Sequence, residues 1–354
     1  MSTIGYAPIL FVVPAKERRV GRAPHAQGSS GGRSDPALTQ GPKRRRLRLW
    51  VPAFAGMTMG VVGALISCPA AAAPTCDRAC LANIATRYMD ALVSQDWRKL
   101  PWAKSVRYSE NSVPMMFGDA IWGSVSSHAK DATIVADPAS GNVAWLGRVD
   151  EHGQPAFYAM RIKVVDGKIA EVETVIRRKE GRPPFGDAAG FVHDKGFLEA
   201  LPAKARPARA AIAAVVRNYY KSVERNNGAV FATFDPACER VENGVLANSG
   251  RNAMARGCAA QLRTGLFADV GSTRFRVPVI DTERGVAVAF GYLDYPQRET
   301  SFKTSDGRSF EAETKYPYSL NFATLFKVTG SGAIQRVDEV APELNYRIPS
   351  PWKE

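Results

Sequence analysis

The sequence MRIKVVDGKIAEVETVI, from Met160 to Ile176, decides the fold of this chain. Its first half alternates apolar with basic residues, which is typical of a strand with one buried face. Asp166-Gly167 follows and favours a two-residue hairpin turn, because both central positions of such a turn need a positive φ. From Lys168 onward, apolar residues again occupy every second position. The stretch therefore predicts a β-hairpin that buries one face.

A second stretch, TLFKVTGSGAIQRVDE from Thr324 to Glu339, repeats this design. Its apolar residues occupy the positions equivalent to those of the first hairpin. The equivalent pairs are Ile162 and Phe326, Val164 and Val328, Ile169 and Ile334, and Val172 and Val337. Ahead of each hairpin, apolar residues at helical spacing predict one amphipathic helix, formed by Leu81, Ile84, Tyr88 and Leu92 in the first case and by Ile212, Val215, Val216, Tyr219 and Val223 in the second. We infer that one fold is built twice.

Between each helix and its hairpin, short strands are expected at 132–136, 143–150 and 156–165, and again at 275–280, 286–293 and 319–328. Tyr219 lies 131 residues after Tyr88, whereas Lys327 lies 164 residues after Lys163. The second copy therefore holds about 30 extra residues, which we place in the polar stretch 293–318. We expect a first domain over 76–178, a linker over 179–206 and a second domain over 207–348. Three linker residues are expected to pack on a domain surface: Phe185, Phe191 and Phe197.

The net charge of +13 does not indicate nucleic-acid binding, because residues 1–72 alone supply +8 and leave +5 for the rest of the chain. Residues 1–48 are rich in Gly, Ser, Pro and Arg, and we expect them to be disordered. The stretch 50–58 resembles a translated intergenic repeat. This places the true start nearer Met57 or Met59, with the residues before it as an extension.

Residues 49–73 carry no charge, follow a basic run and end in small residues, which predicts an export signal. Cleavage after Ala72 would release the protein to the periplasm or outside the cell. Two alternatives stay open: a lipid on Cys68, within a sequence resembling a lipobox, would tether the protein, and an uncleaved segment would anchor it. Membrane contact is expected only through this segment.

Export would favour disulfide bonds among the four remaining cysteines: Cys76, Cys80, Cys238 and Cys258. Three pairings are open, and sequence proximity favours Cys76 with Cys80 and Cys238 with Cys258. Closing the second loop should stabilise the fold by about 3 kcal/mol. A structural metal site is the rival, although the spacings fit no zinc pattern.

A leading helix followed by antiparallel strands resembles the nuclear-transport-factor-2-like (SnoaL-like) superfamily, and within it a group of secreted bacterial and fungal proteins. The matching residues are Cys76-x-x-x-Cys80-Leu81, Tyr88, Arg107-x-x-Glu110-Asn111, Gly118 to Trp122, Ala136-Asp137, Arg161-x-Lys163-Val164 through Glu173, Arg240-x-Glu242-Asn243-Gly244 and Gly257-Cys258. The resemblance implies an α+β fold with two tandem cone-shaped barrels, each a curved antiparallel sheet wrapped around N-terminal helices with an apolar pocket inside. Superfamily members include isomerases, dehydratases, cyclases and proteins that only bind or dimerise, so the fold alone assigns no reaction.

The candidate catalytic residues are Glu110 and Glu242 as proton shuttles, with Tyr88 and Tyr219 as hydrogen-bond donors. A carboxylate at the mouth of an apolar pocket has a raised pKa, which suits it to acid and base work. In the structural alternative, each Glu pairs with a nearby Arg or satisfies backbone groups at a turn, and each Tyr is core.

Three further residues are expected to line the pockets: Arg107, Trp122 and Arg240. For Trp122 the alternative is again core packing. Asp119 and His128 could form an acid–base pair like that of the dehydratases in the superfamily. The sequence shows no catalytic triad, phosphate loop or redox motif, so we expect neither a cofactor nor a metal.

Three functions remain open. The first is an exported tandem protein that binds a small, largely apolar molecule. The second is a cofactor-independent isomerase or dehydratase. The third is a structural or interaction module whose two copies pack sheet to sheet as an internal pseudo-dimer. An enzyme needs an ionisable group inside a closed cavity, whereas a binding protein needs the cavity without it.

Overall fold

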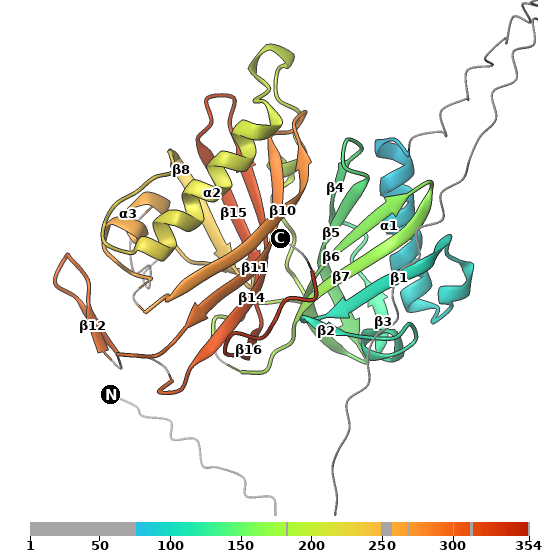
Figure 1. Cartoon of the computed structure of the whole chain (residues 1–354), viewed down its shortest axis with the longest axis horizontal. Coiled ribbons are helices and arrows are strands. Elements are labelled where there is room, and N and C mark those ends of the chain that lie inside the picture. The colour runs from blue at the N-terminus through green and yellow to red at the C-terminus, as the bar shows by residue number, and fades with distance from the viewer. Residues whose placement is uncertain are drawn as a thin grey trace, which may run out of the picture. The chain divides into compact units, whose positions relative to one another are not determined.

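The computed structural model describes residues 76–181, 183–248, 257–267, 269–299, 301–311 and 314–352. The disordered segment expected at 1–48, the export signal at 49–73 and the lipidation site Cys68 lie outside the described residues. The described part of the chain contains two seven-stranded sheets, each packed against a helix (Figure 1). None of its helices has the length and apolar character needed to cross a membrane.

The first sheet and helix α1 (Arg78–Val93) make up what we call the first cone. Its strand order is β2-β1-β7-β6-β5-β3, with β4 also paired to β5. The strands are β1 (Trp102–Glu110), β2 (Val113–Pro114), β3 (Val125–His128), β4 (Thr133–Asp137), β5 (Asn142–Glu151), β6 (Gln154–Val165) and β7 (Lys168–Arg177). The predicted hairpin is β6 and β7, and its turn residues Asp166 and Gly167 have φ of 50° and 72°.

The second sheet, with α2 (Arg209–Arg225) and α3 (Cys258–Arg263), makes up the second cone. Its order β9-β8-β15-β14-β11-β10 repeats that of the first sheet. The strands are β8 (Phe234–Glu242), β9 (Val245–Leu246), β10 (Ser272–Asp281), β11 (Val286–Tyr295), β14 (Tyr318–Val328), β15 (Ile334–Val340) and β16 (Glu343–Asn345). The insertion is divided: about 20 of the extra residues lie between β11 and β14, as expected, and carry the separate hairpin β12 (Ser301–Lys303) and β13 (Ser309–Glu311), whereas about 12 lie ahead of β11.

The sheets are mixed, whereas the sequence predicted antiparallel ones. Strand β1 pairs with β7 in parallel, and β8 pairs with β15 in the same way. Parallel neighbours need a long crossover rather than a tight turn. Here the crossover consists of the other strands of the same sheet, because these lie between the two parallel strands in the chain.

Each cone has its own apolar core between its helix and one face of its sheet. In the first, Asp77 caps α1 by accepting a hydrogen bond from the Cys80 backbone N–H (2.8 Å), and the stripe from Leu81 to Leu92 packs on the sheet. In the second, the stripe of α2 from Ile212 to Val223 does the same. These interiors are the places where a cone can enclose a site.

The opposite faces of the two sheets share a third core. It contains Ala144, Leu146 and Phe157 from the first sheet and Val288 and Phe290 from the second. Alternate residues of these strands face their own helix, so the strands are apolar on both sides, as in sheets covered on both faces. The three linker phenylalanines belong to this core, as predicted: Phe185, Phe191 and Phe197.

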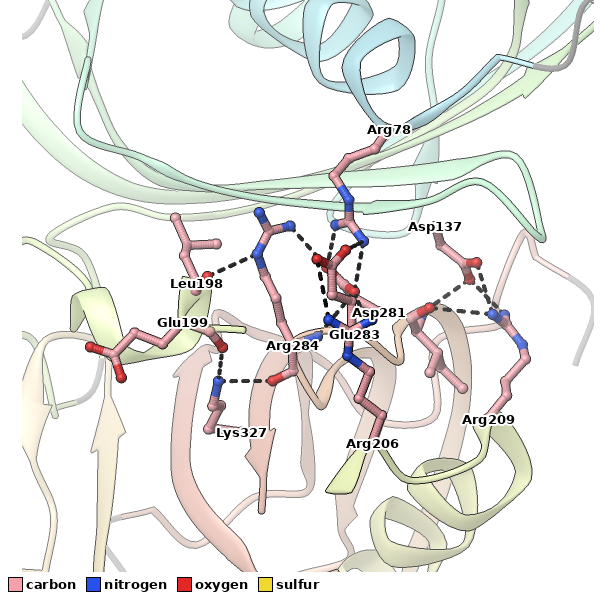
Figure 2. A network of polar contacts seen from close by, with 11 residues as sticks. Arg78, Asp137, Leu198, Glu199, Arg206, Arg209, Asp281, Glu283, Arg284 and Lys327 are labelled. Carbon is pink, nitrogen blue, oxygen red and sulfur yellow. Dashed lines mark hydrogen bonds and ion pairs between the residues drawn. The ribbon is translucent and has the colours of Figure 1, made fainter. Parts of the chain in front are cut away.

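A polar network borders this shared core (Figure 2). Arg78, at the start of α1, pairs with Asp281 at the end of β10 and with Glu283 (2.9 Å) in the β10–β11 turn. Burial raises the pKa of Asp281, but hydrogen bonds from Arg78 and Arg284 outweigh it and hold the pKa below its ordinary value. The Lys327 ammonium donates to backbone carbonyls on either side of it, those of Glu199 (2.7 Å) and Arg284 (2.8 Å). The network therefore ties the start of the first cone to one turn of the second.

The four cysteines form the pairs that proximity favours, Cys76–Cys80 and Cys238–Cys258. The second bridge joins β8 to α3. Two disulfides fit an oxidising location outside the cytoplasm. With the four cysteines paired, no cluster of three or more metal-ligating side chains occurs among the described residues.

Candidate active site

The pairing of β8 with β15 places two acidic residues next to each other inside the second cone. Glu242 lies opposite Glu339, and Arg240 lies opposite Val337. Val337 belongs to the core under α2, and side chains two residues apart on a strand share a face. Arg240, Glu242 and Glu339 therefore project from the same face of the sheet, toward the helix.

These three side chains line a small, partly open cavity of about 20 Å³, together with Tyr219 and Tyr220 of α2. A space of this size holds about one water molecule. The rim consists of side chains that are half-buried: Phe267, Tyr295 and Leu320. The cavity thus combines ionisable groups with aromatic walls.

Glu339 is buried, and burial together with the neighbouring Glu242 carboxylate raises its pKa to about 7. Arg240 and a hydrogen bond from Thr324 act in the opposite direction. The Thr324 hydroxyl donates to Glu339 Oε2 (2.7 Å) and accepts from the Tyr220 hydroxyl (2.8 Å). This chain of hydrogen bonds fixes one carboxyl oxygen and leaves the other available.

Arg240 is the cation of the site. Its two terminal nitrogens donate to Glu242 Oε2 (2.9 and 3.0 Å), and its Nε donates to Gln261 Oε1 (3.1 Å). Burial lowers the pKa of Arg240, but the surrounding negative groups, Glu242 first among them, raise it above its ordinary value. The guanidinium therefore stays charged and its direction is fixed by three hydrogen bonds.

The phenols of the site are neutral. Burial raises the pKa of Tyr219, Tyr220 and Tyr295 above the ordinary value for tyrosine. A neutral phenol can donate a hydrogen bond to a developing oxyanion. The site thus offers a carboxyl group that titrates near neutrality, a fixed cation and neutral hydrogen-bond donors.

The first cone has different residues at the matching positions. Its register pairs Tyr108 with Val172 and Glu110 with Thr174, so Tyr108 stands where Arg240 does and Thr174 where Glu339 does. Glu110 is mostly buried, which raises its pKa, and it accepts a hydrogen bond from the Ile121 backbone N–H (3.0 Å). The structural alternative describes Glu110, which satisfies a backbone group and also pairs with Arg178 (3.4 Å). It describes Glu242 as well, because that carboxylate pairs with Arg240.

Among the buried polar atoms of the first cone that have no hydrogen-bond partner in the described residues, four come from aromatic side chains. They are the hydroxyls of Tyr88, Tyr108 and Tyr158 and the indole nitrogen of Trp122. Tyr88 packs edge-on against Trp122, with ring centroids 5.2 Å apart. The structure thus places the predicted residues Tyr88 and Trp122 inside the first cone, beside Glu110.

The pocket position expected for Arg107 is wrong. Its side chain is 51% exposed and pairs with Glu171 on the outer face of the sheet. Adjacent strand residues point to opposite faces, and Arg240 matches Tyr108, one residue later than Arg107. The Asp119–His128 pair is wrong too, since the His128 ring contacts Asp90 of α1 (2.9 Å).

The sequence reasoning missed Glu339, although a signal was present. Val337 and Glu339 are two residues apart in the second hairpin, and Val337 was assigned to the buried face. The same alternation puts Glu339 on that face. Carboxylates rarely occupy core positions unless they are paired or serve a function, so Glu339 could have been singled out.

The chain matches the model of a domain of unknown function (DUF8021) over residues 75–176 and 205–341. No match to a curated protein is found.

Three solved structures illustrate partial matches, each covering 28–38% of this chain. The epoxide hydrolase/cyclase-like enzyme SalBIII of salinomycin pyran ring formation is 10% identical and covers 38% of this chain and 92% of its own, with a TM-score of 0.26. A nuclear-transport-factor-2-like protein of unknown function from Burkholderia xenovorans is 9% identical. The match covers 33% of this chain and 95% of that protein, with a TM-score of 0.24. A de novo designed protein with a curved β-sheet is 13% identical and covers 28% and 88%, also with a TM-score of 0.24. Because these likenesses are partial, the activity of none of these proteins is transferred to this chain.

Proposed function

Because the chain belongs to the family of the domain of unknown function DUF8021, whose description assigns no activity, we propose a function from the site itself. The second cone is the active site of a cofactor-independent isomerase or dehydratase. The observation that carries this proposal is Glu339, a buried carboxyl group with a pKa of about 7 that faces a cavity beside a fixed guanidinium.

The chemistry follows from the groups present. A carboxyl group that titrates near neutrality can take up a proton and return it within one reaction cycle. Glu339 removes a proton from a carbon next to a carbonyl group, and Arg240 with Tyr219 stabilises the enolate oxygen. The proton then returns to another carbon, which isomerises the substrate, or it leaves with a β-hydroxyl group as water.

Substrate entry requires a rearrangement, because the cavity has room for about one water molecule. The half-buried side chains at its rim, Phe267, Tyr295 and Leu320, are the ones that must give way. A small, largely apolar carbonyl compound fits such aromatic walls best.

A binding role for the first cone is a second candidate function. The four unpartnered polar atoms of its aromatic side chains, from Tyr88, Tyr108, Tyr158 and Trp122, can each donate a hydrogen bond. Buried donors without partners are costly, so an ordered water or a small ligand with acceptor oxygens would satisfy them.

Export is part of the proposal. The two disulfides form and persist in an oxidising compartment, which supports release to the periplasm or outside the cell. Tethering through a lipid on Cys68 is the alternative.

Exchange of carbon-bound hydrogen tests the proposed reaction. The full chain is incubated in D₂O with small enones and β-hydroxy ketones, and deuterium uptake is followed by NMR. For a compound that exchanges with the wild type, we expect Glu339→Gln to slow exchange by about a hundredfold, because the amide cannot accept the proton.

Glu110→Gln is the matched control, since it alters the corresponding strand of the first cone. It should exchange at the wild-type rate. Equal rates in the wild type and in Glu339→Gln would contradict the proposed role of Glu339.

A further inference from the structure

A groove of about 780 Å³ lies between α2 and β10 and is separate from the cavity around Glu339. The helix contributes Arg209, Ala213 and Arg217, which are spaced four residues apart and therefore lie on one face. The strand contributes residues 273–277 and Ile280. The two sites share no lining residue, and the volume is within the range of small-molecule sites.

The groove is cationic. Four arginines line it, and none of the described residues that line it is acidic. Three of the arginines pair with carboxylates that stand outside the lining: Arg209 with Asp137 (2.6 Å), Arg274 with Asp294 (2.8 Å) and Arg276 with Glu173 (2.5 Å).

Arg217 differs from these three. It is exposed, and it makes no ion pair or hydrogen bond with any described residue. Because the other three arginines are paired, Arg217 is the cation that a bound anionic group would meet first. A carboxylate outside the lining, that of Glu224, accepts a hydrogen bond from Thr273 (2.7 Å).

The floor of the groove is apolar. Phe275, Val277 and Ala213 are partly buried against the core of the second cone, and Ile280 is part of that core. Strand β10 is the edge strand of its sheet, which explains why most of its residues are half-exposed. A cation beside an apolar floor favours a ligand with a charged head and an apolar body.

We propose that this groove binds a small amphipathic carboxylate, with its head on Arg217 and its apolar body along Phe275 and Val277. The site is independent of the chemistry proposed for Glu339. The positive charge of Arg217 favours an anionic ligand. The apolar floor favours a ligand with an apolar body over a small, fully hydrated anion, which would make no apolar contacts there.

Calorimetric titration of the full chain with decanoate tests the site. We expect one molecule to bind per chain, more weakly as salt is added. Decan-1-ol, which has the same body without the charge, should not bind measurably. Arg217→Gln should weaken decanoate binding by about fivefold or more, because a charge-assisted contact is lost at a partly exposed position.

Arg225→Gln is the matched control, because it removes an exposed arginine from the same helix outside the groove. It should bind decanoate like the wild type. Glu339→Gln should also bind normally, which separates this site from the proposed active site.

Several results would overturn the proposal: no binding of decanoate, equal binding of decan-1-ol, or an unchanged affinity in Arg217→Gln. Loss of binding in Glu339→Gln would indicate that decanoate binds in the cavity around Glu339 rather than in the groove. Arg217-dependent binding to phosphatidylglycerol vesicles without binding of free decanoate would identify a membrane surface instead.

Discussion

Replacing Arg240 with methionine is expected to lower the free energy of unfolding by about 3–5 kcal/mol at pH 8. Arg240 is buried and donates two hydrogen bonds to Glu242. It also lowers the pKa of the neighbouring Glu339. Methionine fills a similar space without the charge, so two carboxylates lose the cation between them. Urea denaturation of the full chain measures the difference.

The double variant Arg240→Met with Glu242→Gln is the control for this prediction. Removing the Glu242 charge along with Arg240 should restore a large part of the lost stability, because replacing both partners of a buried pair costs far less than removing one. A loss below about 1 kcal/mol in the single variant would show that Glu242 and Glu339 are solvated rather than held by Arg240.

Glu339→Gln is expected to be more stable than the wild type at pH 8 by about 3 kcal/mol. The folded pKa of Glu339 is about 7, above the ordinary value of about 4.5 that the unfolded chain would show. The folded protein therefore binds this proton more tightly, and wild-type stability falls as the pH rises from about 4.5 to about 7. Glutamine stays neutral and can still accept the hydrogen bond from Thr324.

The difference should fade below pH 5, where Glu339 is protonated in the wild type as well. Urea denaturation at a series of pH values from 4 to 8 measures it. Glu311→Gln, an exposed position on β13, should follow the wild-type curve. If Glu339→Gln is no more stable than the wild type at pH 8, then Glu339 is not a strained buried carboxyl group.

Local signals in the sequence predicted the leading helices and the hairpins of both copies, but not strands β1 and β8 or helix α3. The alternation on either side of Asp166-Gly167 predicted β6 and β7, and the equivalent residues of the second hairpin occupy the matching register positions. The register pairs Ile162 with Val172 and Phe326 with Val337. Hairpins are predictable because turn and strands are contiguous.

The long-range pairing was not predictable in the same way. Strands β1 and β7 are separated in the chain by the other strands of the sheet, so no local pattern sets their register. The error at Arg107 follows from this, since a shift of one residue moves a side chain to the other face. Placing Arg240 and Glu242 together was correct because the two lie within one strand. Glu339 joins them only through the parallel pairing of β15 with β8.

The titration of Glu339 itself tests the central claim most directly. The protein is labelled with ¹³C at glutamate side-chain carboxyls, and the Glu339 signal is assigned by its loss in Glu339→Gln. We predict a midpoint near pH 7, set by burial and by the Glu242 charge. A midpoint at or below pH 4.5 would show an ordinary solvated carboxylate and would contradict a proton-transfer site in the second cone.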